Sequence, residues 1–555
     1  MRALAMIGLA LAALIGAALP PRATAEWLVG IGDLRTGAVT MGLWLWKALL
    51  LAHSVLFWVW LKRAEPRRST GDGVGYDSGE QWLTPRRAGL ALASIVVVAL
   101  VLRVVGLGDR LWFDEIKMYV LYMTEPLGTI LATYDDQNQH LLYSLLARLS
   151  TLVYGDGAAA LRMPALVFGI ASIVAAYSLG TRVTSRRESL LVALLLAVSY
   201  HHVWFSQNAR GYTGLLLWSI IATILFLDLL KNRDASRRGL PVLYGCAIAL
   251  GLYTHLTAAV LPAAHAMIAA WAWWGPEAKS EERPAGMPLL VGLVLAGTLS
   301  ILLYAPVLPQ VGSVLFEPSF EGREVAWKTP SWFFTELLGG LTAGVPGGVF
   351  GLLAGAGVAG VGFWSFWKRW SSAALAMVVP VVLTAIAILA LGHNLWPRFF
   401  FFAAAFVVLI GFRGLFDLAG RVGKWGPTIA TVVAVLVAGG SLATVAPVWG
   451  NKQDHEGAEA LVDASATPDD AVVIVDMAIL PYRRWRGRDW LEVHRADELA
   501  EVEAAHERTW LLYSFPTSLR ALEPDVWERI ESEYREVERF PGTVRGGDIL
   551  VMVRE

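Results

Sequence analysis

The stretch "AGLALASIVVVALVLRVVGLGDRLWFDEIKMY", residues 88–119, joins a long apolar run to an acidic pair set between aromatic residues. The run, residues 88–107, carries a single charge, Arg103. A helix needs about 20 apolar residues to cross the ~30 Å hydrocarbon core of a bilayer, so the run predicts a membrane-spanning helix. Asp114 and Glu115 follow shortly after its end, which places two carboxylates just beyond the membrane boundary.

The composition of the whole chain predicts a membrane protein with many spans. Of its 555 residues, 56% are hydrophobic and 17% are charged, and the mean hydropathy is +0.52. These values lie outside ordinary globular usage. The net charge of −1 and the lack of a basic block in the sequence argue against nucleic-acid binding. Cys246 is the single cysteine, so it forms no intrachain disulfide and is expected to be a small buried hydrophobic residue.

The N-terminal residues allow two interpretations. Residues 1–25 contain a basic residue at the start, an apolar stretch to Leu19 and the small residues Ala-Thr-Ala before Glu26. This pattern fits a cleavable signal peptide or a first transmembrane helix, and both place Glu26 outside the cytoplasm. Residues 26–87 are predicted to form a transmembrane hairpin and a cytoplasmic loop.

Apolar runs long enough to be transmembrane helices recur along the chain. They lie near residues 41–61, 88–107, 159–180, 189–206, 212–230, 241–256, 258–275, 288–307, 337–365, 372–391, 397–416 and 427–447. Basic residues gather in alternate connections, which the positive-inside rule predicts to be cytoplasmic. These residues are Lys62, Arg63, Arg67, Arg68, Arg86, Arg87, Arg182, Arg186, Arg187, Lys231, Arg233, Arg237, Arg238, Lys279, Arg283, Lys368, Arg369, Arg413, Arg421 and Lys424. The outer side is then predicted to hold residues 108–158, 207–212, 308–336 and everything after Val448.

Two of these outer regions have patterns of their own. In residues 108–158, apolar side chains recur at helical spacing around Ile116 and again in "HLLYSLLARLS", which predicts two helices lying at the membrane surface. Residues 450–555 are rich in charge, and strand-like runs at 471–476, 509–515 and 549–554 alternate with helical stretches. That alternation predicts a small α/β domain outside the membrane.

The acidic motif "WFDE" contains the first candidate site residues, Asp114 and Glu115. A carboxylate walled by Leu111, Trp112 and Phe113 is partly desolvated, so it is a stronger base than one in water. Alternatively, the pair is a solvated turn that begins a helix. In "YDDQNQHLLY", Asp136 and His140 could bind an anion, relay a proton or help ligate a divalent ion, or could belong to an ordinary polar loop.

Two arginines at predicted outer membrane boundaries are the next candidates. Arg210 lies in "WFSQNARGY", and Arg398 precedes a run of phenylalanines in "HNLWPRFFFF". Each guanidinium could hold the phosphate of a lipid-linked substrate, or could extend to lipid headgroups. The candidate substrate-binding set is completed by Tyr143, Tyr212 and His255. For His255, and for Arg323 and Lys328 in the outer loop, a structural role is the simpler interpretation.

Five motifs in order resemble a known enzyme family. They are "RLWFDE", "NQHLLYSLLARL", "LRMPALVFGIASIVAAYSLG", "SYHHVWFSQNARGYTGLLL" and "LYTHLTAAVLP". Together they resemble the bacterial members of glycosyltransferase family 39, the protein mannosyltransferase-like and aminoarabinose transferase-like enzymes of the GT-C class. The resemblance covers about residues 103–274, with a looser match at "WPRFFFFAAAF". Where many relatives have "HPPLYY", this chain has "QHLLYS".

The resemblance implies a GT-C domain over residues 88–449, with about 11 core transmembrane helices and a catalytic first outer loop. It implies that Asp114 is the catalytic aspartate with Glu115 as its companion, and that His140 and Arg210 occupy conserved site positions. The implied donor is a polyprenyl-phosphate sugar, and no cofactor is implied with certainty, although some relatives use a divalent cation.

These inferences predict an inverting glycosyltransferase of the bacterial inner membrane, acting on an envelope glycan, lipid or protein at the outer face. Asp114 would accept the proton of the acceptor hydroxyl, and Arg398 and Arg210 would stabilise the leaving phosphate. Phe316, Phe320, Trp327 and Trp332 of the 308–336 loop could cover the substrate. The alternatives are a secondary transporter, disfavoured because the polar residues gather at one face and not at the midplane, and a non-catalytic envelope-assembly protein.

Overall fold

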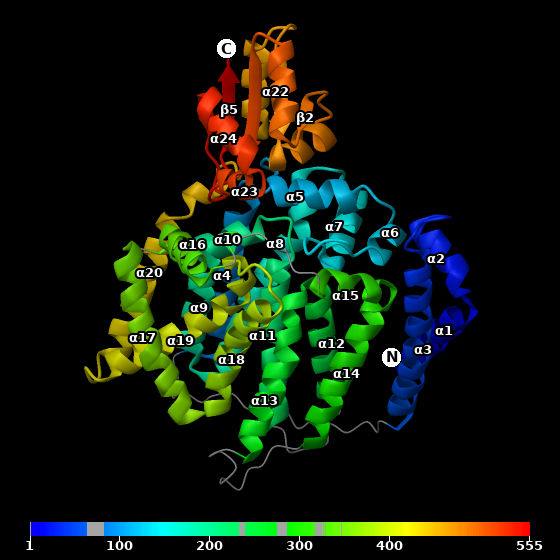
Figure 1. The fold of residues 1–555 in the computed structure, drawn as a ribbon. Helices are drawn as coiled ribbons and strands as arrows, with labels where there is room; N and C mark the ends of the chain where they lie inside the picture. The colour runs from blue at the N-terminus through cyan, green and yellow to red at the C-terminus, as the bar shows by residue number, and fades with distance from the viewer. Residues whose placement is uncertain are drawn as a thin grey trace.

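The computed structural model of the protein describes residues 2–63, 83–231, 239–274, 286–316, 325, 327, 329–345 and 347–555. The predicted loop residues Arg67, Arg68, Arg233, Arg237, Arg238, Lys279, Arg283, Phe320, Arg323 and Lys328 lie outside these ranges. Within them the chain is a bundle of helices, capped at one end by short helices and by a separate α/β domain (Figure 1).

The described residues contain 10 helices that are long and apolar enough to cross a membrane, or up to 12 if two bent pairs each count as one span. This confirms the predicted polytopic helical fold. The spanning helices are α3 (Thr36–Arg63), α4 (Pro85–Val104), α8 (Ala158–Val183), α11 (Tyr212–Lys231), α13 (Val260–Trp274) with the preceding turn η2 (Leu256–Ala259), α14 (Gly286–Tyr304) continuing through η4 (Ala305–Val307) into α15 (Leu308–Phe316), α17 (Gly348–Arg369), α18 (Ser371–Ala390), α19 (Ala404–Gly420) with η6 (Pro397–Ala403), and α20 (Gly426–Ala443) with η7 (Ala446–Trp449).

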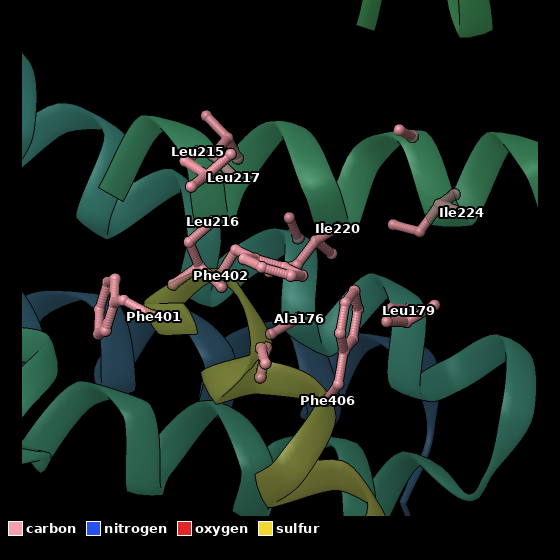
Figure 2. Packing of buried hydrophobic residues seen from close by; sticks show 14 of the residues in the cluster. Ala176, Leu179, Leu215, Leu216, Leu217, Ile220, Ile224, Phe401, Phe402 and Phe406 are labelled. Atoms are coloured by element: carbon pink, nitrogen blue, oxygen red, sulfur yellow. The ribbon is translucent and has the colours of Figure 1, made fainter. Parts of the chain in front are cut away.

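Helix α11 lies at the centre of the bundle. In its most apolar window 78% of residues are buried inside the protein, against 11% for α17, so α17 faces lipid while α11 packs on all sides. Figure 2 shows the packing, in which Phe402 and Phe406 of η6 and α19 lie between α11 and Ala176 and Leu179 of α8. The phenylalanine run that follows Arg398 begins partly exposed and enters the core at Phe401.

The predicted span at 189–206 is two helices, α9 (Arg186–Val198) and α10 (Tyr200–Ser206), bent by 61°. Arg103 of α4, fully buried, donates hydrogen bonds to the carbonyl oxygens of Leu196 and Ala197 at 3.1 and 2.8 Å. A cation at a helix C-terminus satisfies carbonyls that lack a partner in the helix and favours the end of α9 at this point.

Three other predicted spans also differ from the structure. The run at 241–256 is the 15-residue helix α12 (Leu240–Thr254), too short to pass as a full span. The run at 337–365 divides into α16 (Pro330–Gly344) and α17, because Gly347 and Gly348 adopt positive φ angles of 80° and 55° between them. At the N-terminus α1 (Arg2–Ala18) and α2 (Pro21–Val29) meet at 89° where two prolines, Pro20 and Pro21, interrupt the helix.

Short helices of the segment 108–158 cap one end of the bundle (Figure 1). They are α5 (Phe113–Met118), the π turn η1 (Tyr119–Met123), α6 (Leu127–Ala132) and α7 (Leu141–Tyr154). On α7 the small residues Ser144, Ala147 and Ser150 are buried, while Leu149 and Leu152 are exposed. Of the leucines at helical spacing in "HLLYSLLARLS", Leu141 is buried and Leu149 is exposed, so exposed leucine side chains are confined to the C-terminal part of α7.

The C-terminal domain contains one five-stranded sheet in the order β2-β1-β3-β5-β4. Its elements are α21 (His455–Ser465), β1 (Ala471–Val475), η8 (Asp476–Ala478), η9 (Leu480–Trp485), β2 (Leu491–Val493), α22 (Ala496–Ala505), β3 (Thr509–Ser514), α23 (Pro516–Leu522), α24 (Pro524–Glu533), β4 (Arg535–Phe540) and β5 (Ile549–Arg554). Strand β1 pairs in parallel with β2 and β3, whereas β5 pairs antiparallel with β3 and β4. The three predicted strand runs are β1, β3 and β5.

Candidate functional site

Asp114 and Glu115 lie in the first turn of α5, but their surroundings differ. Glu115 is fully buried and forms a two-point ion pair with Arg162 at the start of α8, at 2.7 and 2.8 Å. It also accepts hydrogen bonds from the backbone amides of Trp112 and Ala209. Burial raises the pKa of Glu115, but the charges of Arg162 and Lys452 outweigh it and hold the pKa below its ordinary value. Glu115 is thus a fixed anion that joins α5, α8 and the loop after α10.

Asp114 meets Arg398 of η6 instead. Oδ2 of Asp114 lies 3.3 Å from Nη1 of Arg398, and 13% of the Asp114 side chain is exposed, compared with none of Glu115. The Asp114 oxygen makes no hydrogen bond within the described residues. Asp114 is therefore the carboxylate of the pair that a reacting group could approach.

A second cation, Arg210, comes from the loop between α10 and α11. Its guanidinium donates to the side-chain and backbone oxygens of Asn138, and it lies about 5.7 Å from the ring centre of Tyr212. Asn138 in turn donates to the backbone oxygen of Asp114 at 3.4 Å. Arg210 is consequently held beside the acidic helix, and its Nε makes no hydrogen bond among the described residues.

His140, Tyr212 and His255 form an aromatic cluster against these charges. The ring centres of His140 and His255 are 4.6 Å apart, and each lies within 5.6 Å of the Tyr212 ring. The amide of Gly211 donates to Nδ1 of His140 at 2.9 Å, which leaves Nε2 as the nitrogen without a hydrogen bond in the described structure. Burial and the neighbouring Arg210 lower the pKa of His140 well below its usual value, so the imidazole is neutral at physiological pH.

The remaining candidates, Asp136 and Tyr143, are placed differently. Asp136 accepts from Lys117 of α5 at 2.5 Å and from the amide of Asn138, so it shapes the loop that leads to His140. The Tyr143 hydroxyl donates to the carbonyl oxygen of Leu161 at 2.7 Å, and the side chain is fully buried. The hydrogen bonds of both side chains thus go to residues other than Asp114, Arg210 and Arg398.

Aromatic side chains extend from Arg398 along the bundle. Phe399 lies 5.6 Å from His255, and Phe401 stacks obliquely on Phe205 at 4.2 Å. On the other side the Arg398 guanidinium lies 4.7 Å from the Trp396 ring, which contacts Trp327 and Trp332 of the 308–336 loop. Trp327 and Trp332 therefore pack against the tryptophan beside Arg398, and the covering of a substrate by this segment stays a prediction.

Residues 138–308 match the family model described as dolichyl-phosphate-mannose-protein mannosyltransferase. ArnT from Cupriavidus metallidurans in the apo state has a similar structure, with 15% identity and a TM-score of 0.50 over 84% of this chain and 98% of ArnT. AglB from Archaeoglobus fulgidus, an archaeal oligosaccharyltransferase in complex with an inhibitory peptide and a dolichol-phosphate, is 12% identical with a TM-score of 0.52, covering 84% of this chain and 74% of AglB. A comparison with curated proteins finds no match.

The likeness to these two structures shows that the chain shares their GT-C fold. The residues that match the family model include His140, Arg210 and His255, whereas Asp114 and Arg398 lie outside the matched range. Geometry brings all five into one cluster, from segments far apart in the sequence.

Three residues that hold the charged cluster together were not predicted from the sequence. Arg162 is a lone arginine at the start of an apolar span, and that position was the signal that could have identified it. Lys452 and Gln453 follow the last span, where the composition turns charged, and nothing in their local sequence distinguishes them. Lys452 donates to the carbonyl oxygen of Gln207, and Gln453 accepts from the amide of Phe113.

A cavity of about 450 Å³ lies where the outer loop meets the C-terminal domain. It is lined by Gly108, Asp109, Arg110, Leu111, Tyr119, Asp156, Ala158, Leu161, Asn451, Glu456 and Trp485. None of the predicted site residues lines it, so the cavity and the charged cluster are separate features of the same face.

The charged cluster does not fit a divalent cation. Within the described residues no group of three or more His, Cys, Asp or Glu side chains is arranged to hold a metal ion. The single carboxylate at the centre, Asp114, faces the cations Arg398 and Arg210, which disfavour a further positive charge.

Proposed function

We propose that the protein is an inverting glycosyltransferase that moves a sugar from a polyprenyl-phosphate donor to an acceptor hydroxyl at the outer face of the bacterial cytoplasmic membrane. The observation that carries the proposal is the meeting of Asp114 with Arg398 at 3.3 Å, next to Arg210. Transfer from a lipid phosphate needs a base for the hydroxyl proton and fixed cations for the departing anion, and this cluster has both.

Asp114 is the proposed general base. The acceptor oxygen attacks the anomeric carbon and gives its proton to the Asp114 carboxylate, while the bond between that carbon and the phosphate oxygen breaks and the electron pair leaves with the phosphate. A single displacement inverts the anomeric centre and requires no nucleophile from the enzyme. The partial exposure of Asp114 supports this role better than the fully enclosed Glu115, to which we give a positioning role.

Arg398 and Arg210 are the proposed phosphate ligands. Their guanidinium groups enter the cluster from η6 and from the loop before α11, and each has an Nε without a hydrogen bond in the described chain. Charge-assisted pairs of Arg with phosphate are strong and directional. The partly exposed ring of Phe399 follows Arg398, which supports an isoprenoid tail lying against it.

The acceptor is proposed to be a hydroxyl-bearing envelope glycan, lipid or protein that approaches through the cavity between the outer loop and the C-terminal domain. Tyr119 and Trp485 supply flat apolar faces there, and Asp109 and Asp156 supply hydrogen-bond acceptors. Such a lining suits a neutral hydroxyl-rich group better than an anion.

Transfer of radiolabelled sugar from polyprenyl phosphate to a membrane acceptor fraction, with the purified protein in liposomes, tests the proposal. We expect Asp114→Asn to reduce transfer by about 10²–10⁴-fold, because a general base is lost. Binding of undecaprenyl phosphate should persist in this variant. Glu125→Gln, in the same outer segment, is the matched control and should keep wild-type transfer. Undiminished transfer by Asp114→Asn would refute the assigned base.

A further inference from the structure

The segment that connects the last transmembrane helix to the C-terminal domain is buried to an unusual degree. We call residues 449–456 the strap. Lys452 is 4% exposed and Gln453 is fully buried, although both are polar and belong to a connection between domains. A simple tether lies in solvent, since buried polar groups need partners. The partners of this strap are parts of the proposed active site.

Gln453 links the acidic helix to the C-terminal domain. Its Oε1 accepts from the amide of Phe113 at 2.7 Å, and its Nε2 donates to the carbonyl oxygen of Gly547 at 2.6 Å. Phe113 is the first residue of α5 and the neighbour of Asp114. Its amide is one of those at a helix start that have no partner within the helix. Gln453 thus fixes the start of the helix that carries the proposed base.

Lys452 links the strap to the loop that carries Arg210. Its Nζ donates to the carbonyl oxygen of Gln207 at 2.6 Å, and the ammonium group also lies 5.6 Å from the ring centre of Trp204. Three residues beyond Gln207, Arg210 enters the charged cluster. Adjacent strap residues therefore hold the two segments that supply the base and a phosphate ligand.

The strap is itself anchored on both sides. The Trp449 indole donates to the carbonyl oxygen of Leu102 at 3.0 Å at the end of α4. Arg110, four residues before Asp114, forms ion pairs with Asp454 and Glu456. These contacts fix the strap against the outer loop, so it can transmit the position of the C-terminal domain to the site.

We propose that Lys452 and Gln453 are positioning residues, which keep the Asp114 helix and the Arg210 loop at the separation that sugar transfer requires. The inference rests on the proposed function, and it assigns the C-terminal domain a part in catalysis without contact to the substrate. Because a misplacement of about 1 Å can reduce turnover about 10²-fold, loosening the strap lowers the rate even when substrate binding is retained.

The test uses the full-length protein with Gln453→Met, which keeps the side-chain length but removes both hydrogen bonds. We expect kcat to fall about 10- to 100-fold, with the affinity for undecaprenyl phosphate within about twofold of wild type. Amide hydrogen exchange of residues 113–118 should accelerate, while exchange in α11 stays unchanged. The control is Arg495→Ala, which removes an exposed ion pair with Asp497 in the same domain and should change none of these values.

Conservative variants separate positioning from simple loss of folding. Lys452→Arg keeps a donor for Gln207 and should retain more turnover than Lys452→Met at equal amounts of folded protein. Gln453→Glu keeps an acceptor for Phe113 and serves if the methionine variant does not fold. Wild-type exchange and wild-type kcat in Gln453→Met would overturn the inference. If the wild-type protein itself transfers no sugar, the proposed function fails, and the exchange measurement still decides whether the strap holds α5.

Discussion

Asp114 and Glu115 are adjacent in the sequence, but their surroundings differ. Glu115 is enclosed by the Arg162 guanidinium and two backbone amides, whereas Asp114 faces the Arg398 guanidinium and is partly exposed. Helical geometry accounts for the difference, because neighbouring side chains on a helix point about 100° apart. Glu115 turns toward α8, and Asp114 turns toward η6. The sequence predicted the importance of the pair, but the division of roles depends on Arg162 and Arg398, which lie far away in the chain.

At the residue scale, the phosphate ligands give a direct prediction. Arg398→Gln should weaken binding of undecaprenyl phosphate about 10- to 100-fold, because a charged hydrogen bond contributes about 1.5–3 kcal/mol. Microscale thermophoresis in detergent measures the affinity. Arg421→Gln, an arginine whose side chain is 70% exposed, is the control and should bind as wild type. Equal affinity in Arg398→Gln would exclude Arg398 as a phosphate ligand.

Lys452 gives a prediction about pH. Burial and the nearby Arg162 lower its pKa to about 7, whereas an unfolded lysine titrates at its ordinary value. Between pH 7 and about 10 the Lys452 side chain is therefore mostly protonated in the unfolded chain and mostly neutral in the folded protein. The contribution of Lys452 to stability thus rises with pH. The difference in thermal unfolding midpoint between wild type and Lys452→Met should shift in favour of wild type from pH 7 to 9. Below pH 7 that difference should stay constant.

At the element scale, most transmembrane helices follow from the apolar runs, and their ends agree closely with prediction because a bilayer demands a minimum length. The positions at which these helices bend or break cannot be predicted from the apolar runs in the same way. Hydropathy is continuous through 189–206, and the bend between α9 and α10 depends on Arg103 from another helix. The sequence singled out Arg103 as the one charge in its run, but its partners become known only from the packing.

Replacing Arg103 tests this account of the bend. Arg103→Met removes the donors for Leu196, Ala197 and Ser206 and should destabilise the protein by about 2–5 kcal/mol, since each buried acceptor left unsatisfied costs about 1–3 kcal/mol. The midpoint of thermal unfolding reports the loss. Val104→Met, at the exposed neighbouring position, should have little effect. Comparable midpoints for the two variants would mean that the bend does not need Arg103.

At the scale of the whole molecule, the site is assembled from five segments of the chain. They contain Asp114, His140, Arg210, His255 and Arg398. The order of motifs predicted four of these segments together, and the phenylalanine run predicted the fifth. The α/β domain also followed from its alternating pattern. The attachment of this domain to the proposed site could not be predicted from the sequence. It depends on single hydrogen bonds between Gln453 and Phe113 and between Lys452 and Gln207, and these partners lie hundreds of positions apart in the chain.

The cavity between the outer loop and the C-terminal domain gives a prediction at this scale. Trp485→Ala removes its largest apolar face and should raise the KM for the acceptor about tenfold while leaving undecaprenyl phosphate binding intact. Initial rates at varied acceptor concentration measure the change. Trp274→Ala, at an exposed position 82% open to solvent, is the comparison. A change in donor affinity and not in acceptor KM would place the acceptor elsewhere.

The position of the strap in the chain has a consequence for biosynthesis. Lys452 and Gln453 are synthesised after every helix that contributes to the charged cluster. A nascent polypeptide can therefore insert all its spans and gather its arginines while the start of α5 still lacks its partner. The proposed activity should appear only after the ribosome has released β5, which pairs between β3 and β4. Assembly of the proposed site is thus completed only after the strap and the C-terminal domain have been synthesised.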